Sequence, residues 1–305
     1  MTAVVVVFGA TGLQGGSVLR TLAPHKEYLV RAVSRRPQSE KARELAEQFP
    51  QVEWVQADTD DPDSLDEAVA GASAVFGVTQ FVDSTAASGV DVQEVEYEEG
   101  KRIIDACAKA KVDFVVFSTL PSAAEISNGE FTGIHHFEAK ARIQKYLFAG
   151  PFKSASAVVQ SAVYLQNFLG NARWDDEDDT TVVFGAFDDL DHKIPRVDIE
   201  HDMGLVVKHV IDNRQASTGR VFPVVSGYFS PREIAAAFTQ ATGISAHPIK
   251  VSMDFVLDPG LRAMFEFLAK YDMYAGTPKL QISQALATPL TFWKRSGYQG
   301  PPKAL

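Results

Sequence analysis

Apolar runs and amphipathic stretches alternate regularly from the start of the chain to residue 118. The predicted strands cover residues 4–8, 28–34, 52–57, 74–79 and 114–118. The predicted helices between them cover residues 12–24, 38–48, 62–70 and 91–109. Strands separated by helices of this length pair in parallel, with right-handed crossovers between them. The pattern therefore predicts an α/β fold with a doubly wound parallel sheet.

Two of the predicted strands have almost no polar positions. Residues 4–8 read Val-Val-Val-Val-Phe, and residues 114–117 read Phe-Val-Val-Phe. Continuous apolarity is what a central parallel strand requires, because helices cover both faces of such a sheet. We expect these two strands to lie in the middle of the sheet.

The alternation loosens after residue 155. An acidic loop at 175–179 precedes a hairpin-like stretch at 184–195, and residues 220–225 resemble another strand. A helix follows with Ser230 as N-cap, Pro231 at the first position and Glu233 at the third. The tail, residues 254–274, has a helical pattern rich in Phe, Met and Leu. We therefore expect a first domain over residues 1–155, and a mixed segment over 156–305 that completes the sheet and forms a smaller lobe over its carboxyl edge.

Charge and cysteine content narrow the classes of function. The chain has 29 Lys and Arg against 39 Asp and Glu, a formal net charge of −10. This charge repels phosphate backbones, so direct binding to nucleic acid is not expected and any link to transcription would require a protein partner. The single cysteine, Cys107, excludes an internal disulfide and a cysteine-based zinc site, and no metal is expected. We interpret Cys107 as a small apolar residue in a helix rather than a reactive thiol.

Nothing in the sequence predicts a membrane protein or a secreted one. No stretch reaches the roughly 18 apolar residues that a membrane-spanning helix needs. The first residues lack a basic segment and lead directly into a glycine loop, which indicates a buried strand rather than a signal peptide. We expect a soluble protein of the cytoplasm.

A glycine-rich loop joins the first predicted strand to the first predicted helix. It reads Gly-Ala-Thr-Gly-Leu-Gln-Gly over residues 9–15, with the spacing G-x-x-G-x-x-G. In this position, free backbone N–H groups at the start of a helix bind the pyrophosphate of a dinucleotide, as in Rossmann-type folds. The alternative is a tight turn without a ligand, but the location within a βαβ unit favours binding. The predicted contacts are Gly9, Thr11, Gly12, Leu13, Gln14 and Gly15.

The end of the second predicted strand indicates which dinucleotide is bound. A cofactor without a 2′-phosphate is usually held there by an acidic side chain that accepts from the ribose hydroxyls. This chain has Ser34, Arg35 and Arg36 and no acid. Arg35 can pair with a 2′-phosphate and Ser34 can donate to it, whereas Arg36 fits a solvated turn equally well. The sequence therefore predicts NADP(H) rather than NAD(H).

Polar residues after the third and fourth strands are further candidates for cofactor binding. Asp58 is placed to accept from the adenine amino group, with a helix cap as its alternative role. Thr79 and Gln80 end the fourth strand and are expected to line the ribose side of the cofactor.

The expected catalytic position carries an unusual residue. Reductases of this build place a tyrosine four residues before a lysine, and the lysine lowers the pKa of the tyrosine and holds the nicotinamide ribose. Here the lysine is Lys140, but the tyrosine position holds His136. Imidazole can move protons near neutral pH, so His136 is a candidate proton donor, with a polar helix start as the alternative. Ser118, at the end of the fifth strand, is placed to support a substrate carbonyl or to cap a turn.

Taken together, these segments resemble the NmrA-like family, atypical short-chain dehydrogenases related to isoflavone reductases. The matching pieces are residues 7–16, 34–35, 56–58, 136–140 and 164–168, and the likeness continues through 198–204 and 229–238. The resemblance implies that Lys140, Tyr164 and Asn167 face the nicotinamide end of the cofactor. One departure is Gln160, where the family commonly has an arginine, and it affects the contacts expected on the nicotinamide side.

The resemblance implies a protein that binds NADP without being an efficient dehydrogenase. Members of the family resemble redox sensors whose cofactor occupancy alters their contacts with other proteins, including GATA-type transcription factors. The first hypothesis is therefore a regulator that acts through protein contacts, with weak or no dehydrogenase activity, in the cytoplasm and also the nucleus.

The alternative hypothesis is an NADPH-dependent oxidoreductase of the isoflavone-reductase type. It would act on a small hydrophobic carbonyl, enone or imine, with Lys140 as cofactor anchor and His136 or a water as proton donor. A cluster of apolar residues in the second segment would form the wall of the substrate pocket. Its members are Phe255, Met264, Phe265, Phe267, Leu268 and Tyr271. Core packing explains this cluster equally well, so the sequence leaves open whether the protein is an enzyme.

Overall fold

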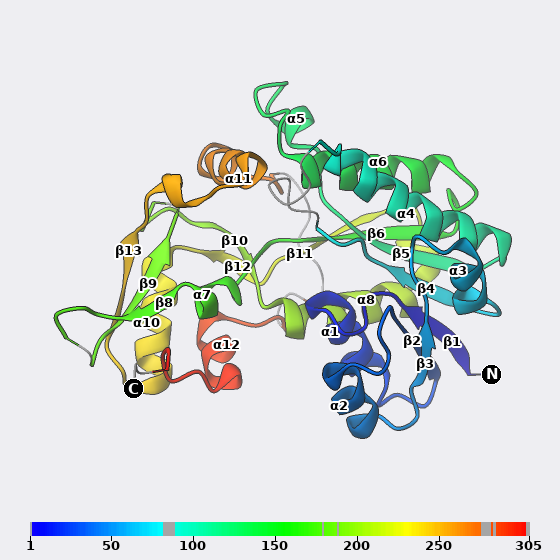
Figure 1. Cartoon of the computed structure of the whole chain (residues 1–305), viewed down its shortest axis with the longest axis horizontal. Helices are drawn as coiled ribbons and strands as arrows, with labels where there is room; N and C mark the ends of the chain where they lie inside the picture. Colours follow the sequence, from blue (N-terminus) through cyan, green and yellow to red (C-terminus); the bar gives the residue numbers. More distant parts are fainter. Residues whose placement is uncertain are drawn as a thin grey trace.

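The larger lobe is built around a parallel sheet of seven strands in the order β11-β6-β5-β4-β1-β2-β3 (Figure 1). The structure is a computed structural model that describes residues 2–81, 89–178, 180–187, 189–275, 282 and 285–302. The strands of this sheet are β1 (Ala3–Val7), β2 (Tyr28–Ser34), β3 (Glu53–Gln56), β4 (Ala74–Gly77), β5 (Phe114–Thr119), β6 (Ser156–Ser161) and β11 (Val221–Val224). This arrangement confirms the predicted doubly wound fold. The strand order reverses beside β1, where such sheets bind ligands at their carboxyl ends.

Helices cover both faces of the sheet, as the apolar central strands require. The helices of this lobe are α1 (Leu13–Leu22), α2 (Glu40–Gln48), α3 (Pro62–Val69), α4 (Val92–Lys109), α5 (Ala123–Ile126), α6 (His135–Ala149), α8 (Ile199–Asp212) and α9 (Arg214–Ser217). One core joins α1, α2 and α8 to the face that contains Val5 and Val7. A second core joins α3, α4 and α6 to the opposite face, which contains Val6 and Phe8. Cys107 is fully buried in this second core, in agreement with its interpretation as a core residue.

The smaller lobe contains two three-stranded sheets, ordered β12-β10-β7 and β13-β9-β8 (Figure 1). Their strands are β7 (Val163–Tyr164), β8 (Ala172–Trp174), β9 (Val182–Ala186), β10 (Ile194–Val197), β12 (Gly227–Phe229) and β13 (Ala246–Lys250). The helices are α7 (Asn167–Gly170), α10 (Pro231–Thr242), α11 (Pro259–Lys270) and α12 (Pro289–Ser296), with a 3-10 turn η1 (Met253–Phe255). A separate core that includes Phe184, Phe238 and Trp293 holds this lobe together. The predicted capping box at Ser230 and Glu233 is present at the start of α10.

Two expectations for the second half need correction. The stretch 184–195 is not a hairpin, because β9 and β10 belong to different sheets and do not pair with each other. The tail 254–274 is not helical throughout, because α11 begins only at Pro259 after η1. Strands β6 and β11 both follow residue 155 and extend the large sheet, while the division at residue 155 stays a prediction.

Helix α1, which follows the glycine loop, packs closely against α8. The two helices approach closely at Gly204, whose backbone N–H donates to Ser17 Oγ at 2.9 Å. A Cβ at position 204 would lie 2.1 Å from Thr21 Oγ1 and 2.3 Å from the Ser17 carbonyl oxygen. Only glycine therefore permits this contact, which sets the position of the helix that carries the candidate site.

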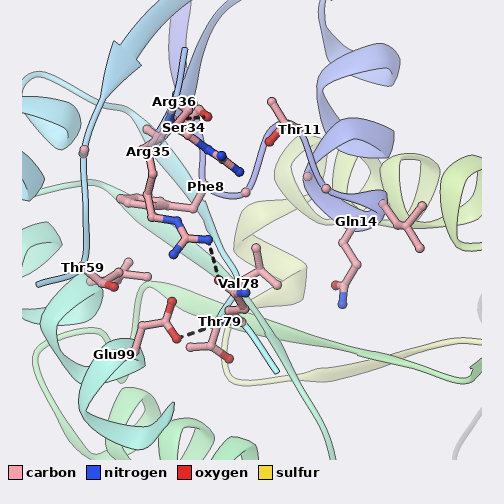
Figure 2. A pocket seen from close by; sticks show the side chains of 18 of the residues that line it. Phe8, Thr11, Gln14, Ser34, Arg35, Arg36, Thr59, Val78, Thr79 and Glu99 are labelled. Atoms are coloured by element: carbon pink, nitrogen blue, oxygen red, sulfur yellow. Dashed lines mark hydrogen bonds between the residues drawn. The ribbon is translucent and has the colours of Figure 1, made fainter. Parts of the chain in front are cut away.

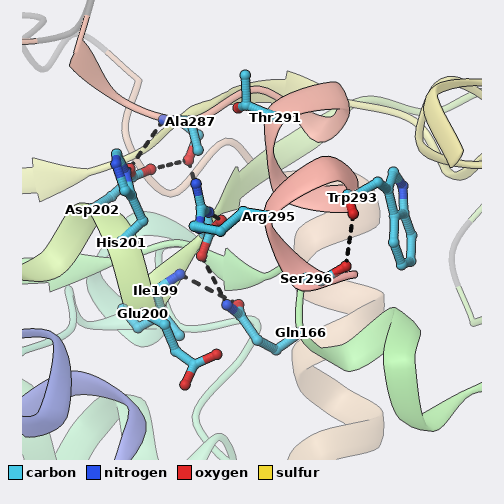
Figure 3. Close-up of polar contacts among 12 residues, drawn as sticks. Gln166, Ile199, Glu200, His201, Asp202, Ala287, Thr291, Trp293, Arg295 and Ser296 are labelled. Carbon is cyan, nitrogen blue, oxygen red and sulfur yellow. Dashed lines mark hydrogen bonds and ion pairs between the residues drawn. The ribbon is translucent and has the colours of Figure 1, made fainter. Parts of the chain in front are cut away.

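A polar cluster joins the two lobes at the start of α8 (Figure 3). Asp198 is 1% exposed and forms an ion pair with Arg295 of α12. Gln166 Nε2 donates to Asp198 Oδ1 at 2.8 Å, and the backbone N–H of Ala287 donates to Asp202 Oδ1 at 3.0 Å. The cluster links the C-terminal helix, the turn before α7 and helix α8 in one network.

Membrane insertion has no support in the described part of the chain, where every helix is too short or too polar to cross a bilayer.

Candidate functional site

A cavity of about 460 Å³ opens at the carboxyl ends of β1, β2 and β4 (Figure 2). It lies at the point where the strand order reverses, the usual ligand site of an open α/β sheet. The lining residues are Phe8, Gly9, Thr11, Gly12, Leu13, Gln14, Gly15, Val33, Ser34, Arg35, Arg36, Ser39, Ala57, Thr59, Leu65, Val78, Thr79, Gln80, Glu99, Ile103 and Tyr164. The structure thus brings together the six predicted contacts of the glycine loop, the residues that follow β2 and β4, and Tyr164.

The glycine loop has the geometry of an anion-binding loop. Gly9 has a φ of +62°, a backbone conformation that residues other than glycine rarely adopt. A Cβ at Gly15 would lie 2.3 Å from the Gly9 carbonyl oxygen, so the helix can start this close to the strand only with glycine there. Gly12 is the N-cap of α1, and no side chain caps this helix. Backbone N–H groups at the positive end of α1 are therefore available to a phosphate group from the cavity.

The end of β2 brings positive charge to the cavity without a neighbouring acid from the same strand. Arg35 Nη2 donates to Gln80 Oε1 at 2.7 Å, and the backbone N–H of Arg36 donates to Ser34 Oγ at 3.1 Å. Figure 2 shows Arg35 extending toward the side of the cavity where Val78, Thr79 and Glu99 lie. Both arginines line the cavity, so Arg36 is a second candidate for contact with a phosphate.

Glu99 of α4 is a lining residue that the sequence did not single out. The backbone N–H of Gln80 donates to Glu99 Oε2 at 3.1 Å. Burial raises the pKa of Glu99 to about 7, against the opposing effects of the Gln80 hydrogen bond and the charges of Arg35 and Arg102. The cavity therefore contains a carboxyl group that changes its charge near neutral pH.

Three predicted residues form a hydrogen-bonded chain at the other end of the cavity. Ser118 Oγ donates to Gln14 Oε1 at 2.6 Å, and Gln14 Nε2 donates to the Tyr164 hydroxyl oxygen at 2.8 Å. Ser118 is 1% exposed and does not line the cavity, whereas Tyr164 does. Burial raises the pKa of the Tyr164 phenol, so this group stays protonated near neutral pH.

Lys140 lies in a buried polar cluster behind the wall of the cavity. It forms an ion pair with Glu96 of α4, and its Nζ donates to Thr79 Oγ1 at 3.1 Å. Thr79 Oγ1 in turn donates to Glu96 Oε1 at 2.7 Å. Burial lowers the pKa of Lys140 from its ordinary value. Of this cluster only Thr79 lines the cavity, so in this structure the lysine charge is directed at Glu96.

His136 is packed among aromatic rings outside the cavity. Its ring meets Phe81 edge-on at 5.3 Å and Phe137 at 5.1 Å between centroids. Burial lowers the pKa of His136 to about 4, although the charge of Asp258 opposes this shift. The imidazole is therefore neutral near pH 7 and is a weak candidate for a general acid.

Comparison with known proteins agrees with this geometry. The sequence profile of the NmrA-like family matches residues 1–293. The chain belongs to the NmrA-like family. One relative, an NmrA-like family domain-containing oxidoreductase of Aspergillus campestris, is 31% identical over 297 residues, which cover 92% of this chain and 80% of that protein.

Two solved structures show how the NmrA-like fold is shared. The negative transcriptional regulator Nmra in complex with NAD superposes with a TM-score of 0.78 at 20% identity, covering 96% of this chain and 94% of that one. The triphenylmethane reductase of Citrobacter sp. complexed with NADP(H) superposes with a TM-score of 0.66 at 18% identity, covering 97% and 100%. At these identities the likeness establishes the common fold.

Two further predicted residues of this NmrA-like chain lie outside the cavity. Asp58 is in the turn after β3, where its Oδ1 accepts from the backbone N–H of Asp60 at 3.1 Å. The cap of α3 is Asp61, so Asp58 does not take the alternative role of a helix cap. Asn167 lines a second cavity of about 370 Å³ in the smaller lobe, together with Arg196 and Phe265. Contacts of Asp58 with adenine and of Asn167 with nicotinamide stay predictions.

The apolar cluster expected as a substrate wall is divided in the structure. Phe267 and Leu268 are buried in the main core, against which Met264 and Tyr271 pack. Phe265 faces the second cavity, and Phe255 is 76% exposed. Most of this cluster therefore serves the core.

Glu96 and Glu99 are acidic residues of the site region that sequence reasoning missed, and the lining residues Ser39 and Thr59 were missed as well. A signal for Glu96 was present, because it lies four residues after Val92 and four before Gly100, all buried on the same face of α4. Glu99 precedes the cavity-lining Ile103 by four residues and so shares its face. An acid in register with an apolar helix face is a sign of a buried, paired or functional carboxyl.

Within the described ranges, no three His, Cys, Asp or Glu side chains come together as a metal site would require.

Proposed function

We propose that this protein binds a nicotinamide dinucleotide, with NADP(H) preferred, and acts as a redox-responsive regulator through contacts with other proteins. Dehydrogenase activity is weak or absent in this proposal. The observation that carries it is a cavity lined by the glycine loop and by Arg35, beside Lys140, which is paired with the buried Glu96. Groups that suit a dinucleotide line the cavity, whereas the two residues expected to transfer protons, His136 and Lys140, do not.

The described residues fit the parts of the cofactor in turn. The N–H groups at the start of α1 and the close approach at Gly15 suit the pyrophosphate. Arg35 and Ser34 suit the 2′-phosphate, and Arg36 lies beside them. Ala57, Leu65 and Ile103 supply an apolar surface for the adenine ring. When bound, the nicotinamide supplies hydride chemistry, and in a regulator its redox state is the signal that is read.

Weak activity follows from the surroundings of the candidate acid and its lysine. An efficient proton donor has a pKa near the working pH and lies within hydrogen-bond reach of the substrate. Burial lowers the pKa of His136 to about 4, and His136 does not line the cavity. Lys140 is directed at Glu96 and so is not positioned to activate a donor in the cavity.

Turnover measurements test this part of the proposal. With NADPH and a panel of quinones, enones and imines, oxidation followed at 340 nm is expected to stay at the uncatalysed rate. Steady oxidation with a kcat near the enzyme median of roughly 10 s⁻¹ would contradict the regulator and favour an enzyme.

The second candidate function is an NADPH-dependent oxidoreductase of the isoflavone-reductase type. Two observations favour it: a relative that is 31% identical carries the name oxidoreductase, and the Tyr164 phenol lies in the cavity in its protonated form. In this candidate Tyr164, hydrogen-bonded by Gln14, would donate the proton in place of His136. Loss of turnover in Tyr164→Phe with unchanged nucleotide affinity would identify that role.

The output proposed for the regulator is a changed surface for a partner protein, such as a transcription factor. The net charge of −10 disfavours direct contact with DNA, so a protein partner is the proposed target. The proposed locations are the cytoplasm and the nucleus.

A further inference from the structure

We propose that Glu99 is a specificity-determining residue, whose ionised carboxylate disfavours a 2′-phosphate and whose protonated form permits it. The protein would thus bind NADP in preference to NAD more strongly at lower pH. This inference rests on the proposed dinucleotide binding and adds the residue that sets the balance between the two cofactors.

Glu99 is placed beside the cation that is proposed to hold the 2′-phosphate. Gln80 joins the two, because its side-chain oxygen accepts from Arg35 at 2.7 Å while its backbone N–H donates to Glu99 at 3.1 Å. Arg35, Gln80 and Glu99 all line the same cavity. A phosphate that pairs with Arg35 is therefore brought into the field of the Glu99 carboxyl.

The charged groups around Glu99 come from three elements. Arg35 follows β2, Arg102 is on α4 itself, and Asp60 lies in the turn between β3 and α3. Arg102 is already paired with Asp60 at 2.9 Å, so these two charges largely cancel. Arg35 is left as the main cation that acts on Glu99. An ionised Glu99 weakens the attraction of Arg35 for a phosphate and adds a repulsion of its own.

Glu99 changes its charge near neutral pH, so pH can alter how strongly the Arg35 region attracts a 2′-phosphate. Burial raises its pKa to about 7, so its charge changes between about pH 6 and 8. A bound 2′-phosphate would favour the protonated form and raise this pKa further. NADP binding would then be linked to proton uptake, whereas NAD, which lacks the phosphate, would cause much less.

The test compares wild type with Glu99→Gln by calorimetric titration with NADP⁺ and NAD⁺ at pH 6.5 and 8.5. Glutamine resembles the protonated acid and does not titrate. At pH 8.5 the variant is expected to bind NADP⁺ about five- to tenfold more tightly than wild type, with NAD⁺ changed by less than about twofold. At pH 6.5 the two proteins are expected to agree within about twofold. The 2′-phosphate itself titrates near pH 6, so the comparison uses the difference between the proteins at each pH.

Glu98→Gln is the matched control, because it removes the same charge from the same helix at a residue outside the cavity. It is expected to leave the preference between the nucleotides unchanged. A second measurement needs no variant: wild-type titrations at pH 7.5, in buffers of different ionisation enthalpy, are expected to show net proton uptake with NADP⁺ and little with NAD⁺.

An equal change of affinity for both nucleotides in Glu99→Gln would overturn the inference, because Glu99 would then contact a part that they share, such as adenine. An unchanged preference, or NADP⁺ binding without proton uptake, would also overturn it. These results leave the dinucleotide site standing, whereas wild type that binds neither nucleotide would overturn the proposed function and this inference together.

Discussion

Replacing Lys140 with methionine is expected to lower the free energy of unfolding by about 3–5 kcal/mol, the range for removing one partner of a buried ion pair. The physical reason is that Glu96, at 2% exposed, would keep a buried charge without its cation. Methionine preserves most of the volume of the lysine stem, so the loss reports the charge rather than a cavity. Urea denaturation followed by circular dichroism measures the effect.

Two further variants separate the buried pair from a general effect of helix α6. Lys145 is on the same helix as Lys140 and forms an exposed ion pair with Glu125 of α5. Lys145→Met is expected to cost less than about 1 kcal/mol. Adding Glu96→Leu to Lys140→Met is expected to restore most of the lost stability. Lys140→Met could instead lower the free energy of unfolding no more than Lys145→Met does, while weakening nucleotide binding. Lys140 would then be a cofactor anchor, and the Lys140–Glu96 pair would not stabilise the fold as expected.

Replacing Arg35 with alanine is expected to weaken NADP⁺ binding by about 1.5–3 kcal/mol, with a much smaller effect on NAD⁺. The guanidinium lines the cavity at the end of β2, and the 2′-phosphate is the only part that distinguishes the two nucleotides. Competition or calorimetric titration with both nucleotides gives the two changes in affinity.

Arg36→Ala is the control for this experiment, because Arg36 is the neighbouring cation and lines the same cavity. If Arg36→Ala loses less of the preference for NADP⁺ over NAD⁺ than Arg35→Ala does, the 2′-phosphate is assigned to Arg35. If Arg36→Ala loses more, the 2′-phosphate is assigned to Arg36. Equal weakening of NADP⁺ and NAD⁺ by Arg35→Ala would refute the assignment.

The larger lobe was predictable because its signals are local. Each strand of the sheet from β1 to β5 and each of the helices α1 to α4 has its own run of apolar or amphipathic residues, and the glycine loop marks the join between the first two elements. The predicted ends differ from the observed ones by a few residues. The lining of the cavity follows from this fold, because the carboxyl ends of parallel strands meet at one edge of the sheet.

The features that were missed depend on partners far along the chain. Strands β9 and β10 are close in sequence, but β9 pairs with β13 and β10 with β12, so local alternation suggested a hairpin that does not exist. Lys140 and Glu96 are 44 residues apart, and no residue near Lys140 in the sequence indicates that it forms an ion pair with a carboxylate on another helix. Glu99 lines the cavity because α4 packs beside it, and its register with Ile103 marks the helix face but not the Arg35 and Gln80 side that it meets.

The central claim is that the N–H groups at the start of α1 and the arginines after β2 form a binding site for a nicotinamide dinucleotide. Calorimetric titration of the purified protein with NAD⁺, NADH, NADP⁺ and NADPH tests it most directly. The expected result is saturable binding at one site per chain, with the 2′-phosphorylated pair favoured by about tenfold or more at neutral pH. No saturable heat with any of the four nucleotides, up to millimolar concentration, would contradict the claim.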